Sequence, residues 1–134
     1  MNNVNNILLV DDDDTGTFLT KIVIKKLDQS INVDNVWNGK EALDYFGGND
    51  NTSLSKHPDL ILLDINMPIM NGFEFLEEFN GNNTYPKNIP IVILTTSTYS
   101  NDFKQAIKYN VLEFLEKPLS VDMLSSVLDK VRQS

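Results

Sequence analysis

The sequence predicts an α/β fold: a doubly wound, five-stranded parallel sheet between two layers of helices, a three-layer (βα)5 sandwich. Two observations support this prediction. Short apolar runs alternate along the chain with segments whose apolar residues recur at helical spacing. The runs at 7–10, 60–63 and 91–94 are continuous, which is typical of parallel strands covered by helices on both faces.

The strands and helices are expected to alternate along the whole chain. The predicted strands are 7–10, 33–37, 60–63, 91–94 and 112–115. The predicted helices carry the apolar residues of 18–27, 41–46, 72–79, 103–107 and 124–131. Two stretches rich in turn formers, 47–57 and 80–88, are interpreted as surface loops. We therefore expect residues 1–134 to form one compact domain.

The composition excludes several classes of protein. Nineteen acidic against eleven basic side chains give a net charge of -8, which opposes binding to nucleic acid and anionic membranes. Because there is no cysteine, any metal is expected to be held by oxygen ligands, which suit magnesium, calcium or manganese. The first residues, MNNVNN, carry no targeting signal, and no run approaches the roughly twenty apolar residues that span a bilayer. The expectation is a soluble, cytoplasmic protein.

Polar residues follow four of the predicted strands. The first strand ends in the aspartates 11–14, the third in Asp64, the fourth in Thr95 and Thr96, and the fifth in Lys117. In open parallel sheets, functional side chains gather beyond the carboxyl ends of the strands. Carboxylates within about 4 Å repel by roughly 4 kcal/mol per pair at an effective dielectric near 20, so such a cluster favours a cation.

The residue types also indicate a chemistry. Magnesium prefers oxygen ligands and keeps several waters, so Asp12, Asp64 and the carbonyl of Asn66 could form an incomplete shell. A carboxylate beside a metal can be a nucleophile, while the hydroxyl of Thr95 and the ammonium of Lys117 hold oxygens of a transferred group.

Each residue also has a purely structural interpretation. Asp13 and Asp14 fit a helix N-cap and first turn better than a site. Thr95 could simply end a strand, and Lys117 alone could be a solvated lysine. Asp64 is harder to explain this way, because a charge directly after four apolar residues of a central strand is costly without a partner.

Five segments together resemble the response-regulator receiver family, in its single-domain CheY-like form with a flavodoxin-like fold. They are ILLVDDD (7–13), WNGKEAL (37–43), LILLDINMPIMNGFEFL (60–76), VILTTS (92–97) and FLEKP (114–118). The most specific signal is the third, in which an apolar strand and Asp64 precede Met67, Pro68 and Gly72.

The resemblance implies a phosphorylation site that binds Mg²⁺. Asp64 would be the phosphoacceptor. Asp12, Asp64 and the carbonyl of Asn66 would bind the metal, with Asp11 acting through a metal-bound water. No other enzymatic activity is implied beyond phosphorylation of Asp64 itself and slow loss of the phosphoryl group.

The resemblance also assigns residues around the phosphoryl group. Thr95, Lys117 and the backbone of Thr96 would contact its oxygens, and Phe114 would be an aromatic switch, or else a core residue. A cis peptide is implied between Lys117 and Pro118.

The sequence departs from the family pattern at two positions. Thr96 stands where a smaller residue is common and could crowd the phosphate, and Asn110 replaces a frequent glycine. Asn66 and Ser97 stand where the family tunes the lifetime of the phosphate.

The implied partners are proteins. A sensor histidine kinase or a histidine phosphotransfer protein would donate the phosphoryl group, and the surface formed by residues 102–131 would control a downstream protein. No effector domain follows in this sequence, so the output is expected to be intermolecular. His57 is interpreted as a solvated loop residue.

Three other interpretations of these polar residues are less consistent with the sequence. Asp11, Asp13 and Thr15 spell the DxDxT of haloacid-dehalogenase-type phosphatases, but no later strand carries that family's acidic metal ligands, and Asp64 would be unexplained. An EF-hand calcium loop fails because its twelfth position would be Ile22. A receiver that acts without phosphorylation is disfavoured by the intact polar residues.

Overall fold

The computed structural model of the protein describes residues 4–47, 57–67, 69–82, 85–86, 88–96, 104–106, 108–109 and 111–133. The strands are β1 (Asn6–Val10), β2 (Asn32–Val36), β3 (Leu60–Leu63), β4 (Ile91–Thr95) and β5 (Glu113–Glu116). The helices are α1 (Asp14–Leu27), α2 (Gly39–Gly47), α3 (Gly72–Gly81) and α5 (Val121–Gln133). Of the helix expected at 103–107, residues 104–106 are described and are helical, while Phe103 and Ile107 lie outside the described residues.

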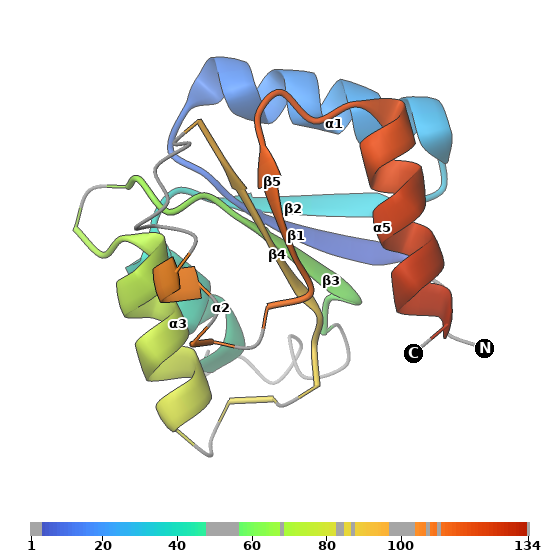
Figure 1. Ribbon diagram of the computed structural model, residues 1–134. Helices are drawn as coiled ribbons and strands as arrows, with labels where there is room; N and C mark the ends of the chain where they lie inside the picture. Colours follow the sequence, from blue (N-terminus) through green and yellow to red (C-terminus); the bar gives the residue numbers. More distant parts are fainter. Residues whose placement is uncertain are drawn as a thin grey trace.

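The five strands form one parallel sheet in the order β2-β1-β3-β4-β5. Helices α1 and α5 cover one face, and α2 and α3 cover the other (Figure 1). The predicted fold class is therefore confirmed. The chain passes from β1 to β2 on one side and then returns to place β3 on the other side of β1. This reversal between β1 and β3 is where open α/β sheets form their binding crevice.

The central strands divide their side chains between two cores. On β1, Leu8 and Val10 pack toward α2 and α3, whereas Ile7 and Leu9 pack toward α1 and α5. All four are fully buried, as are the four residues of β3. Burying such a side chain contributes roughly 1.5–3 kcal/mol, so the sheet is a rigid support for whatever follows its strands.

Helix α1 does not bury all of the apolar residues of 18–27 from which it was predicted. The inward side carries Thr17, Thr20 and Ile24, while Phe18 and Ile22 are exposed. Asp13 caps this helix, its side chain accepting a hydrogen bond from the N–H of Gly16 at 3.2 Å. The cap lies only three residues after β1, which fixes how the helix is rotated over the sheet. Within the described ranges no helix is both long and apolar enough to cross a bilayer.

Candidate functional site at the carboxyl edge of the sheet

The candidate site is built on the residues that directly follow the strands. The N–H of Asp11 donates to the carbonyl of Val36 at 3.0 Å, and the N–H of Asp64 to that of Val10 at 2.9 Å. The N–H of Lys117 donates to the carbonyl of Thr95 at 2.7 Å. Each backbone is thus held by the neighbouring strand, one residue past the end of its own, so the sheet sets the positions of the side chains.

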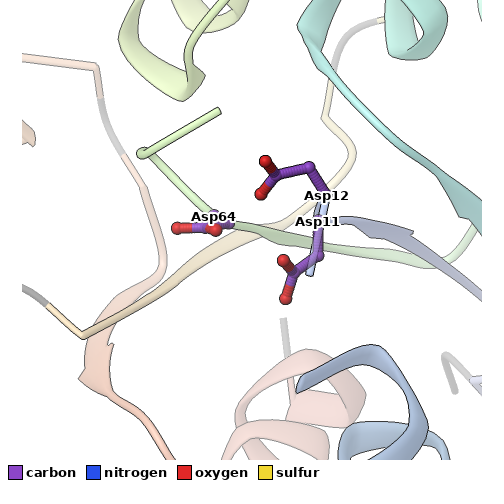
Figure 2. Close-up of side chains that lie close together, drawn as sticks. All are labelled: Asp11, Asp12 and Asp64. Carbon is purple, nitrogen blue, oxygen red and sulfur yellow. The ribbon is translucent and has the colours of Figure 1, made fainter. Parts of the chain in front are cut away.

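Three carboxylates meet at the reversal between β1 and β3. One oxygen each of Asp11, Asp12 and Asp64 lies within 4.8 Å of the others, and Figure 2 shows the three groups around a common space. Asp11 is 1% exposed and Asp64 7%, while Asp12 faces solvent. An all-oxygen set with this much negative charge suits a hard divalent cation.

Lys117 supplies a positive charge to this cluster. Its Nζ lies 2.7 Å from Oδ2 of Asp11 and 3.5 Å from Oδ2 of Asp64. Burial opposes the charged form of Lys117, but the hydrogen bond to Asp11 and the charges of Asp64 and Asp11 outweigh it, so the lysine pKa is raised. The peptide between Lys117 and Pro118 is cis, as the resemblance implied.

Asp64 has a strongly shifted pKa among the carboxylates of the described residues. Burial raises the pKa of Asp64 from 3.8 to about 6, although the N–H of Asn66 and the charge of Lys117 lower it and the charge of Asp11 adds to the rise. With three carboxylates and one ammonium, the cluster carries a net charge of -2 once Asp64 is ionised. A cation that binds here would remove this repulsion and favour the ionised form of Asp64.

The loop between β3 and α3 brings a backbone group to the site. The N–H of Asn66 donates to Oδ1 of Asp64 at 3.1 Å. Asn71 caps α3 in a capping box with Glu74, and the N–H of Gly72 donates to the carbonyl of Ile65 at 3.2 Å. A Cβ on Gly72 would lie 2.7 Å from the carbonyl oxygen of Asp64, so only glycine allows this close approach.

The other predicted residues lie around this centre. Thr95 is fully buried at the end of β4. Thr96 is exposed and lines a cavity of about 250 Å³ together with Lys117 and residues of α1. Phe114 is half-buried and packs against the core under α2 and α3. Pro68, Ser97 and Asn110 lie outside the described residues.

Three further features were not predicted from the sequence. Gly39 approaches the β3–α3 loop so closely that a Cβ would lie 2.9 Å from the carbonyl oxygen of Met70, which accepts its N–H. The signal was present as the glycine of WNGKEAL. Ile69 adopts φ 72° although it is β-branched, and no sequence pattern indicated this. His57 is exposed, as expected, but its ring stacks on Phe46.

The chain matches the family model of the response regulator receiver domain over residues 7–129. Together with the sheet order and the site geometry, this match shows that the protein belongs to the response regulator receiver family, the signalling domain of two-component systems.

Individual relatives agree with this assignment. The probable methanogenesis regulatory protein FilR2 of Methanothrix harundinacea is 31% identical over 127 residues, which cover 95% of this chain and 81% of FilR2. The aerobic respiration control sensor protein ArcB of Escherichia coli is 30% identical over 93% of this chain, which spans 15% of the length of ArcB. Receivers similar to this one therefore occur both in short regulators and within long sensor proteins.

Solved structures show the same fold. A two-component response regulator from Legionella pneumophila is 31% identical, with a TM-score of 0.84 over 97% of this chain and 99% of that one. The response regulator Rcp1 is 29% identical, with a TM-score of 0.75 over 96% of this chain and 92% of that one, and its structure is of a Mn²⁺-bound form. That form is consistent with a divalent cation at the carboxylates of this site.

Proposed function

We propose that the protein is a phosphorylation switch in which Asp64 accepts a phosphoryl group from a phosphohistidine. The donor would be a sensor histidine kinase or a histidine phosphotransfer protein of a two-component system or phosphorelay. The observation that carries the proposal is the position of Asp64: a buried carboxylate at the reversal of the sheet, beside both Lys117 and two further carboxylates.

The transfer would proceed by attack of an Asp64 carboxylate oxygen on phosphorus. The bond between phosphorus and the imidazole nitrogen breaks, its electron pair stays on that nitrogen, and an acyl phosphate forms on Asp64. Because the pKa of Asp64 is about 6, the carboxylate is mostly ionised and nucleophilic at neutral pH. Lys117 would hold a phosphoryl oxygen, together with the hydroxyl of Thr95 and the backbone of Thr96.

The carboxylates fit Mg²⁺ as the accompanying ion. Asp12, Asp64 and the carbonyl of Asn66 would hold it directly, and Asp11 through a water. When bound, the ion neutralises charge on the carboxylates and on the phosphoryl oxygens. With the charge of Asp11 offset in this way, Lys117 would be available to hold a phosphoryl oxygen.

The switch would convert this local charge into a change of surface. Phosphorylation adds negative charge and three strong acceptors, which give Thr95 and Lys117 new hydrogen bonds. Two charge-assisted bonds of roughly 1.5–3 kcal/mol each approach the about 5.5 kcal/mol that inverts a 1:99 equilibrium. The surface of residues 102–131, with Phe114 as the aromatic switch, would present the change to a downstream protein.

The first test is the intact mass of the protein after incubation with acetyl phosphate, with and without Mg²⁺. The wild type should gain the mass of one phosphoryl group only with Mg²⁺, and Asp64→Asn should gain none. Asp14→Asn is the matched control, because Asp14 is an exposed aspartate of the first turn of α1 and should be labelled like the wild type. An unlabelled wild type contradicts the proposal, and labelling of Asp64→Asn would instead indicate Asp11 as the nucleophile.

A further inference from the structure

Tyr109 lies between α3 and the start of β5 and contacts α3 at several points. Its hydroxyl donates to Oε2 of Glu77 at 3.0 Å, and its ring stacks on that of Phe73 with 6.2 Å between the centroids. The side-chain amide of Asn80 donates to the backbone carbonyl of Tyr109 at 3.4 Å. Three residues of α3, each about one turn further along the helix, therefore contact Tyr109.

Helix α3 is in turn fixed to the phosphoacceptor loop. The N–H of Gly72 donates to the carbonyl of Ile65, and the helix start packs directly against the backbone of Asp64. Phe73, the next residue, is buried in the core and carries the ring on which Tyr109 stacks. A displacement of the loop after Asp64 would therefore reach the residues that contact Tyr109.

Tyr109 is also connected to the opposite side of the site through β5. Four residues after it, β5 begins, pairs with β4 from Glu113 to Glu116, and ends next to Lys117. The Nζ of Lys117 lies 2.7 Å from Asp11 and 3.5 Å from Asp64, and its shorter contact, with Asp11, would change when it binds a phosphoryl oxygen on Asp64. The two elements that would rearrange around the phosphoryl group, the β3–α3 loop and the end of β5, are therefore bridged by Tyr109.

We propose that Tyr109 and Glu77 form a latch, a hydrogen-bonded contact between α3 and the segment before β5 that stabilises the unphosphorylated form and opposes phosphorylation of Asp64. The structure contains the lysine contacts of the unmodified site together with the closed latch. A contact made in one of two forms shifts their equilibrium toward that form by its own free energy. The inference rests on the proposed function of Asp64.

The surroundings of Tyr109 leave room for such a movement. It lines a cavity of about 550 Å³ on the side of Asn66 and Glu74 and another of about 390 Å³ on the side of Asn80 and Lys108. Burial and the hydrogen bond to Glu77 both raise the pKa of Tyr109, so its hydroxyl stays a neutral donor near pH 7. The contact can therefore break without a proton leaving the protein.

The test compares affinities for beryllium trifluoride, a non-covalent mimic of a phosphoryl group, in the presence of Mg²⁺. Trp37, the single tryptophan, directly follows the residue whose carbonyl binds the N–H of Asp11, so its fluorescence can report binding. Tyr109→Phe should lower the apparent dissociation constant about fivefold, the factor that corresponds to one hydrogen bond of about 1 kcal/mol. Adding Glu77→Ala to this variant should lower it no further, since the latch is already open.

Tyr45→Phe is the matched control. Its hydroxyl donates to Asp34 at 2.8 Å, an equivalent tyrosine–carboxylate bond between α2 and β2. Both variants should lose thermal stability, but only Tyr109→Phe should bind the mimic more tightly. Unchanged or weaker binding by Tyr109→Phe, or equally tighter binding by Tyr45→Phe, would overturn the latch alone. A wild type that does not bind the mimic would overturn the phosphoacceptor proposal and the latch with it.

Discussion

Replacing Asp64 with asparagine should make the protein more stable at neutral pH, although it removes the proposed phosphoacceptor. Asp64 is 7% exposed, and its pKa is raised to about 6 because burial disfavours the ionised form. Asparagine has nearly the same size, and its Oδ1 can still accept the hydrogen bond from the N–H of Asn66. The variant therefore keeps the packing and the local hydrogen bond while removing a buried charge.

The size and sign of this effect follow from the two pKa values of Asp64. Between pH 3.8, the ordinary value, and about pH 6, the folded protein binds more protons than the unfolded chain. The wild type thus loses stability as the pH rises through this window, and the loss is complete above it. Two pKa units correspond to about 3 kcal/mol, which solvent screening at the open edge of the site reduces to about 1–2 kcal/mol.

The assay is urea denaturation of both proteins without divalent ions at several pH values from 5 to 8. The difference in free energy of unfolding should grow from pH 5 to about pH 7 and then stay constant, with Asp64→Asn the more stable protein. Asp14→Asn removes an exposed charge and should show no such dependence. A variant less stable than the wild type at pH 7, or a difference independent of pH, would refute the electrostatic argument.

Three further predictions concern the ion, the loop and the lysine. Mg²⁺ at a hundred times its dissociation constant should stabilise the wild type by about 2.7 kcal/mol in thermal denaturation, and Asp64→Asn much less; equal stabilisation would place the ion elsewhere. Gly72→Ala should cost about 1–3 kcal/mol in unfolding free energy, because its Cβ would collide with the backbone of Asp64. Gly81→Ala, with open space around its Cβ at the end of the same helix, should be neutral or stabilising, and a similar loss in both would contradict the collision. Lys117→Met should slow labelling by acetyl phosphate at least about 100-fold in a mass time course, and an unchanged rate would show that the ammonium is dispensable.

Much of the fold was predictable because short continuous apolar runs that alternate with helical patterns are typical of parallel strands covered on both faces. β3 begins and ends where its run LILL does. β2 and β5 are each displaced by one residue from the predicted ranges 33–37 and 112–115, since their bounds follow the hydrogen-bond register with β1 and β4. Both are edge strands with partly exposed residues, and there hydrophobicity does not mark the last paired residue.

The convergence of the site residues was predictable for a related reason. Parallel strands end at one edge of the sheet, so residues directly after apolar runs must lie near one another, as Asp11, Asp64 and Lys117 do. Which side of α1 faces the core was harder to predict. The adjacent apolar residues Ile22, Val23 and Ile24 point in different directions around a helix, and Thr17 is buried while Phe18 is exposed. The contact of Tyr109 with Glu77 joins residues 32 positions apart and depends on how α3 lies on the sheet, which no local pattern contains.

The hydrogen bonds that hold Asp11, Asp64 and Lys117 one residue past their strands join main-chain atoms only. Side chains can therefore change during evolution without removing these bonds. The positions of the proposed site residues depend on main-chain pairing within the sheet. Different apolar side chains can maintain that pairing as long as the strands stay buried. The outer surfaces of the helices take no part in that pairing, so their residues can change while the backbone positions of Asp11, Asp64 and Lys117 are kept. An arrangement of this kind allows one reaction to be reused in many signalling circuits, each distinguished by its exterior alone.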